Sequence, residues 1–127
     1  MIINISVSLG ELLDKISILK IKNQNITDKN KLILINEELK LLENTLSKLI
    51  KDKKIQDFLA KLIEINSDLW KIEDDIRDCE RNKKFGQKFI DLARAVYFTN
   101  DKRSQIKLDI NNCFGSKIVE VKSYEKY

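Results

Sequence analysis

Apolar residues recur at alternating spacings of three and four over two successive segments, and this pattern constrains the fold more than any other feature. The first segment covers residues 32–49 and the second covers residues 55–79. Such spacing places the apolar side chains on one stripe of an α-helix, as in the seam of a coiled coil. The connection, residues 51–54, is short and polar. We therefore expect an antiparallel hairpin roughly 35 to 40 Å long.

Composition favours helix over most of the chain. The 127 residues include no proline and three glycines, so little interrupts a helix. We expect an all-α fold, a helical bundle built on the coiled-coil-like hairpin, in one domain covering residues 1–127. Alternation near both ends predicts short extended segments there, which pair in a small sheet. The expected helices span residues 8–24, 28–51, 54–82, 87–99 and 101–113.

Two features define where the predicted helices start and stop. Ser8 and Glu11 form a capping box, in which the Ser8 hydroxyl accepts from the amide three residues on. The apolar stripe that begins at Phe89 becomes polar at Asn100, Arg103 and Lys107. We interpret this change as a helix break at 99–101, a good capping sequence. The alternative is one helix whose core face turns polar midway.

Charge, cysteines and hydropathy limit the partners that the protein can bind and indicate its location in the cell. The net charge of +4 comes from 24 basic and 20 acidic residues. They are interleaved along the chain, so we do not expect nucleic acid to bind. Cys79 and Cys113 lie at apolar-stripe positions and are predicted to be buried free thiols. No stretch has the length of a membrane span or the features of a signal peptide, so we expect a cytoplasmic protein without a membrane partner.

The available side chains exclude several kinds of chemistry. Histidine is absent, which excludes imidazole acid-base chemistry, histidine metal sites and Ser-His or Cys-His nucleophile pairs. The three glycines are widely separated, so no Walker or dinucleotide loop is present. Glu11 with Asp14, and Asp75 with Asp78, are an imaginable magnesium site. Basic residues lie between these two pairs, and we expect no metal and no cofactor.

One group of candidate site residues lies in the most highly charged run of the chain. Trp70, Glu73 and Arg77 share one helix face. An indole beside an arginine can bind a sugar or a phosphorylated ligand, because arginine offers a bidentate fork and tryptophan a stacking plane. The alternative is a solvated ladder of ion pairs beside a core tryptophan.

A second group follows the start of the last predicted helical region, and it can meet Arg77 if that region packs on the preceding helix. It either forms a basic pocket for an anion or a helix junction whose charges satisfy one another. Its members are Asp91, Arg94, Asn100, Asp101, Arg103 and Lys107.

Four blocks of the chain resemble a family of small uncharacterised bacterial and phage proteins. The blocks lie within residues 8–22, 69–77, 89–107 and 115–127. Members of that family look like companions of glycosyltransferases and tetratricopeptide repeats in surface-polysaccharide settings. The resemblance therefore implies a sugar-nucleotide, glycan or scaffold role in surface-polysaccharide biosynthesis.

These observations together favour a binding or assembly module over an enzyme. We expect a homo-oligomer that self-associates through the helical hairpin. Arg77, Arg94, Arg103 and Lys107 are expected to hold an anionic small molecule, an acidic segment or a glycosyltransferase-type partner. The alternative is a small enzyme that acts on a phosphorylated or nucleotide-linked sugar, with Glu73 or Asp74 as general base or metal ligand.

Overall fold

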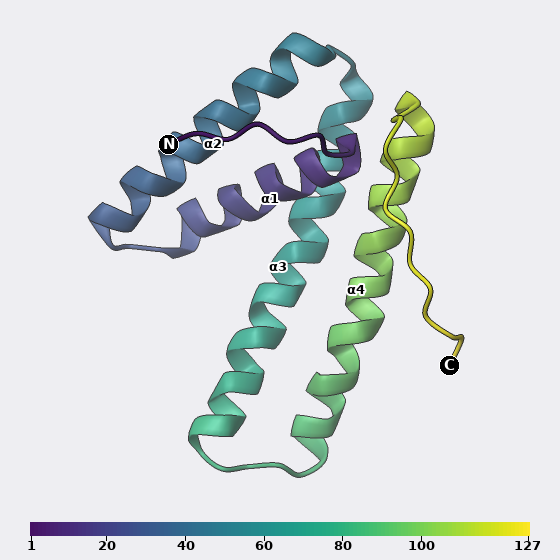
Figure 1. Ribbon diagram of the computed structural model, residues 1–127. Coiled ribbons are helices and arrows are strands. Elements are labelled where there is room, and N and C mark those ends of the chain that lie inside the picture. Colours follow the sequence, from purple (N-terminus) through teal and green to yellow (C-terminus); the bar gives the residue numbers. More distant parts are fainter.

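The computed structural model describes all 127 residues and contains four α-helices and no β-strand (Figure 1). The predicted all-α class is therefore confirmed, and the ends of the first three helices lie within two residues of the predicted ones. None of the helices combines the length and the apolar character needed to cross a membrane. The helices are α1 (Leu9–Asn25), α2 (Lys29–Leu49), α3 (Lys53–Arg81) and α4 (Gln87–Phe114).

The helices form two antiparallel pairs that meet at one end (Figure 1). α3 and α4 make the long hairpin, and α1 packs against α2, α3 and α4. α2 packs along α1 and diverges from α3. The predicted long hairpin between residues 28–51 and 54–82 is therefore wrong, because the partner of α3 along its length is α4.

Two features explain why α3 pairs with α4 instead of α2, namely the connection between α2 and α3 and the position of α1. Ile50 and Asp52, in the connection between α2 and α3, have extended backbone angles, so α3 leaves at an angle instead of folding back along α2. α1 covers the apolar stripe of α2 and contacts the upper part of α3. A spacing of three and four predicts that a stripe is buried, but it does not identify the helix that covers it. The core consists of Leu12, Leu13, Ile16, Leu46, Ile55, Leu59, Leu62 and Ile110.

The first turn of α1 is fastened to the last turn of α4. The predicted Ser8 cap is confirmed, since its Oγ accepts from the Glu11 amide at 3.1 Å. The Gly10 amide donates to Asn111 Oδ1 of α4 at 2.8 Å. The Glu11 carboxylate accepts from Lys107 Nζ at 2.7 Å. The amides that a helix N-terminus leaves free are thus satisfied partly from another helix.

α4 is continuous from residue 87 to residue 114, so the predicted break at 99–101 is wrong. Two of the polar residues that suggested the break contact other segments. Arg103 contacts Asn66 of α3, and Lys107 pairs with Glu11 and Glu120. A helix continues through polar residues when their groups are satisfied across the helix interface.

The two ends of the chain do not form the predicted sheet. Residues 1–8 and 116–127 contain no helix or strand. The N-terminal segment passes over α1 and α2, whereas residues 116–127, here called the tail, return along α4 (Figure 1). The tail is held by an ion pair between Glu120 and Lys107 and by a hydrogen bond from the Tyr127 hydroxyl to the Asp101 carboxylate.

The two cysteines differ in burial. Both thiols are free, and Cys79 is buried as predicted. Cys113 is exposed, which corrects the prediction for that residue. Position 113 lies in the last turn of α4.

Candidate functional site

A buried polar network lies where α1 meets α3. Asn66 of α3 donates through Nδ2 to Asp14 Oδ1 and to Ser17 Oγ of α1, both at 2.8 Å. The Ser17 hydroxyl donates to the Asp14 backbone carbonyl at 2.6 Å. All three residues are at most 5% exposed. The network therefore replaces apolar contact with a fixed set of hydrogen bonds at this point of the interface.

Arg103 of α4 reaches this network but is not satisfied by it. Its Nη1 lies 3.5 Å from Asn66 Oδ1, which is a long hydrogen bond. Its Nε is buried and has no hydrogen-bond partner. A guanidinium has five donor hydrogens and no acceptor, so this one retains an unmet need for acceptor oxygens.

Arg103 and Asn66 line a groove of about 420 Å³ between α1, α3 and α4. Trp70, the only tryptophan in the chain, lies on the α3 side of this groove, where it is partly buried. The lining combines a flat aromatic surface with hydrogen-bond donors and charged side chains. The lining residues are Ile18, Ile21, Lys22, Asn66, Leu69, Trp70, Glu73, Asp74, Arg77 and Arg103.

The groove carries a small positive excess. Three basic residues face two acidic ones, Glu73 and Asp74, in its lining. Arg77 Nε lies 3.4 Å from Glu73 Oε2, but both side chains are more than half exposed, so this pair contributes little to stability. Neither Lys22 nor Arg103 takes part in an ion pair within the chain.

Lys107 lies one turn after Arg103 and is already satisfied. Its Nζ lies 2.7 Å from Glu11 Oε2 and 2.9 Å from Glu120 Oε2, and the side chain is 8% exposed. Burial acts to lower the pKa of Lys107, but the hydrogen bonds to Glu11 and Glu120 outweigh it, and the net pKa is raised. The hydrogen bonds from Lys107 and Lys122 lower the pKa of Glu120 to about 2. This cluster fastens the tail to α1 and α4.

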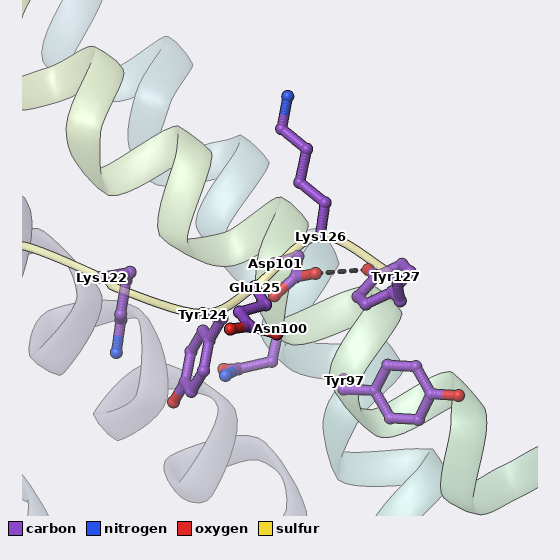
Figure 2. A pocket seen from close by; sticks show the side chains of 8 residues that line it. All are labelled: Tyr97, Asn100, Asp101, Lys122, Tyr124, Glu125, Lys126 and Tyr127. Carbon is purple, nitrogen blue, oxygen red and sulfur yellow. Dashed lines mark hydrogen bonds between the residues drawn. The ribbon is translucent and has the colours of Figure 1, made fainter.

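A second cavity, of about 770 Å³, lies between α4 and the tail (Figure 2). α4 contributes Tyr97, Asn100 and Asp101, and the other lining residues come from the tail. The tail residues in its lining are Lys122, Tyr124, Glu125, Lys126 and Tyr127.

The nine candidate residues from the sequence thus divide between several places. Four of them line the groove, namely Trp70, Glu73, Arg77 and Arg103. Asn100 and Asp101 line the tail cavity, and Lys107 lies in the ion-pair cluster. Asp91 accepts from Gln87 Nε2 at 2.7 Å, and the Arg94 guanidinium lies over the Phe98 ring at 5.8 Å. These last two residues line neither cavity.

Sequence reasoning missed the polar residues at the helix interface. Asn66 lies between Leu62 and Leu69 at spacings of four and three, and Ser17 follows Leu13 by four. A polar residue at a position of the apolar stripe was the signal that could have found them. The carboxylates of the magnesium alternative do not come together, and no group of three or more metal-ligating side chains is present.

The fold and the groove define a small all-α protein with a polar, aromatic-walled groove at a three-helix junction. The chain belongs to a family of unknown function, DUF6165, whose sequence profile matches residues 1–127. No curated protein and no solved structure matches the chain.

Proposed function

We propose that this protein is a non-enzymatic binding module that holds an anionic ligand, or an acidic segment of a partner, in the groove between α1, α3 and α4. One observation carries the proposal. Arg103 lines the groove with a buried Nε that has no partner, and its Nη1 reaches the Asn66 oxygen only at 3.5 Å. A carboxylate or phosphate in the groove would offer the Arg103 guanidinium the acceptor oxygens that the chain does not supply, since guanidinium groups recognise these anions through paired hydrogen bonds.

The rest of the lining limits the kind of anion. The groove has only a small positive excess, because Glu73 and Asp74 offset two of its three basic residues. It therefore attracts a highly charged anion only weakly. Trp70, with Leu69 and Ile21, offers apolar surface to the uncharged part of a ligand. We therefore propose an organic anion with one charged group near Arg103 and a planar or apolar part on Trp70. The resemblance to companions of glycosyltransferases adds nucleotide sugars to the compounds worth testing.

Trp70 makes occupancy of the groove directly measurable, since it is the only tryptophan. Its fluorescence is followed during titration with phosphate, sulfate, nucleotides and nucleotide sugars. We expect a saturable change with at least one organic anion. Arg103→Gln should weaken that binding by about tenfold or more, because a charge-assisted hydrogen bond is worth about 1.5 to 3 kcal/mol.

Arg94→Gln is the matched control, since it removes the same charge from the same helix outside the groove. Both variants are compared with the native protein by circular dichroism and thermal melting, so that a folding defect is recognised. The proposal is wrong if no anion gives a saturable change, or if a folded Arg103→Gln protein binds as tightly as the Arg94→Gln protein.

The same samples also test the enzyme alternative. Product formation from nucleotide sugars and nucleoside triphosphates is measured with magnesium present. The protein would be an enzyme if it turned over one of these compounds, and if Glu73→Gln or Asp74→Asn abolished that turnover without loss of binding.

Self-association is the second part of the proposal, and the outer side of α2 supports it. Among the helices, α2 packs against α1 alone. It exposes Ile33, Leu34, Leu41 and Leu49, each by more than half. Apolar side chains gathered on an otherwise charged helix are typical of an association surface. Sedimentation velocity of the native protein and of Leu34→Lys with Leu41→Lys tests this part, and a native monomer across the accessible concentrations would exclude it.

A further inference from the structure

All three tyrosines of the chain line the single cavity between α4 and the tail. Tyr97 comes from α4, whereas Tyr124 and Tyr127 come from the tail. Tyrosines are enriched at binding sites because the ring offers a large apolar face and the hydroxyl a polar tip. This cavity is separate from the groove, and the inference below does not depend on the function proposed for the groove.

The tyrosine rings differ in the contacts that they make within the chain. The Tyr127 ring packs edge-on against Phe98 at 5.0 Å and against Tyr97 at 5.5 Å, and its hydroxyl bonds to Asp101. Tyr127 therefore fixes the end of the tail. Tyr124 packs against no other aromatic ring and is 75% exposed, so most of its ring surface is open to solvent.

Asn100 supplies unused hydrogen-bonding groups next to Tyr124. Figure 2 shows the Asn100 amide pointing toward the Tyr124 ring, with Tyr97 on the other side of Asn100. Asn100 is partly buried and forms no side-chain hydrogen bond within the chain. Its amide offers two donor hydrogens and an acceptor oxygen to whatever occupies the cavity. Glu125 adds carboxylate oxygens in the same lining.

The charges of the lining select against ions. Lys122 and Lys126 are balanced by Asp101 and Glu125. The lining as a whole therefore carries no net charge, so Coulomb attraction favours neither an anion nor an organic cation. A purely apolar ligand would leave the Asn100 amide without partners. The remaining class is a neutral molecule with both an apolar face and several hydroxyl groups.

We infer that the cavity between α4 and the tail binds a neutral sugar, with its C–H face on the Tyr124 ring and its hydroxyl groups bonded to Asn100 and Glu125. A pyranose ring has the required combination, since its axial hydrogens form an apolar face and its edge carries hydroxyls. The cavity of about 770 Å³ has room for one or two such rings.

The test is a nuclear magnetic resonance titration of the ¹⁵N-labelled full chain with glucose, galactose, N-acetylglucosamine and maltose, up to about 50 mM. That limit exceeds the millimolar Kd expected for a single exposed stacking ring. We expect at least one sugar to shift the amide signals of residues 97–101 and 122–127 in a saturable way. Tyr124→Ala should weaken this binding by about tenfold, whereas Tyr124→Phe, which keeps the ring, should stay within about threefold.

Phe85→Ala is the matched control, because Phe85 is an exposed aromatic residue in the connection between α3 and α4, outside the cavity. It should leave sugar binding unchanged. Choline and inorganic phosphate are titrated in parallel. The inference is overturned if no sugar shifts these signals, if choline or phosphate shifts them and the sugars do not, or if a folded Tyr124→Ala protein binds sugar as the native protein does.

Discussion

Gly10 of α1 lies against the backbone carbonyl of Lys107 of α4, so closely that a β-carbon at position 10 would stand 2.5 Å from that oxygen. No real β-carbon tolerates such a distance to a backbone atom, so a side chain here must push the two helices apart. The same approach allows the Gly10 amide to donate to Asn111. The contact therefore sets the distance between α1 and α4 where their ends meet.

We predict that Gly10→Ala destabilises the protein by about 2 kcal/mol, the usual size of an overpacking defect. Alanine favours helix over glycine by about 1 kcal/mol when nothing else changes, so a loss of stability would have the opposite sign to helix propensity. Urea unfolding followed by circular dichroism measures the effect. Gly86→Ser is the control, since nothing lies near Gly86 and serine is a good helix cap. Equal or higher stability of Gly10→Ala would contradict the close approach.

Asn66→Ala should lower the free energy of unfolding by about 2 kcal/mol, because it leaves Asp14, Ser17 and Arg103 short of a hydrogen-bond partner in a buried place. The comparison is Asn36→Ala on the exposed side of α2, where alanine should be neutral or slightly stabilising. If the two substitutions had the same effect, the buried network would contribute nothing to stability.

Lys107→Met should destabilise the protein by about 2 kcal/mol and release the tail. The substitution keeps most of the length of the side chain, but it leaves the Glu11 carboxylate without its cation and Glu120 with Lys122 alone. Limited proteolysis of residues 116–127 measures release of the tail, and chemical unfolding measures stability. Lys102→Met, at an exposed position of the same helix, should change neither. A tail that remained protected in Lys107→Met would show that other contacts hold it.

Acid should loosen the tail only at low pH. The pKa of Glu120 is about 2 in the folded protein, below its ordinary value of 4.5, so its ionised form is favoured by folding. Its contribution to stability is complete above pH 4.5 and is lost as the pH falls through about 2. Side-chain carboxyl chemical shifts between about pH 6 and pH 2 follow this titration directly.

Glu120→Gln provides the reference for that titration. Native protein should lose more stability than the variant over the same range of pH, because only the native chain has a carboxyl group to protonate at this position. Parallel curves for the two proteins would mean that Glu120 has the same pKa in the folded and unfolded states.

Local sequence was sufficient for the helices themselves. Ser8 accepts from the amide three residues on, as its capping box predicts, and α3 begins where the apolar repeat resumes after a polar connection. Helix-forming residues, caps and periodicity act within a few residues of each other, so they can be read without knowledge of the rest of the fold. The shared face of Trp70, Glu73 and Arg77 was predicted for the same reason, and all three line one groove.

Tertiary structure decided which helices pair and what the polar residues do. The stripe of α3 is equally compatible with α2 or α4 as its partner, and the insertion of α1 between α2 and the long hairpin decided between them. Asn100, Arg103 and Lys107 predicted a break in a helix that is continuous. The partners of Arg103 and Lys107 come from distant segments, namely Asn66, Glu11 and Glu120. A short-range pattern specifies that a side chain is polar or apolar, whereas the free energy of placing it at an interface depends on groups that only folding brings within hydrogen-bond distance.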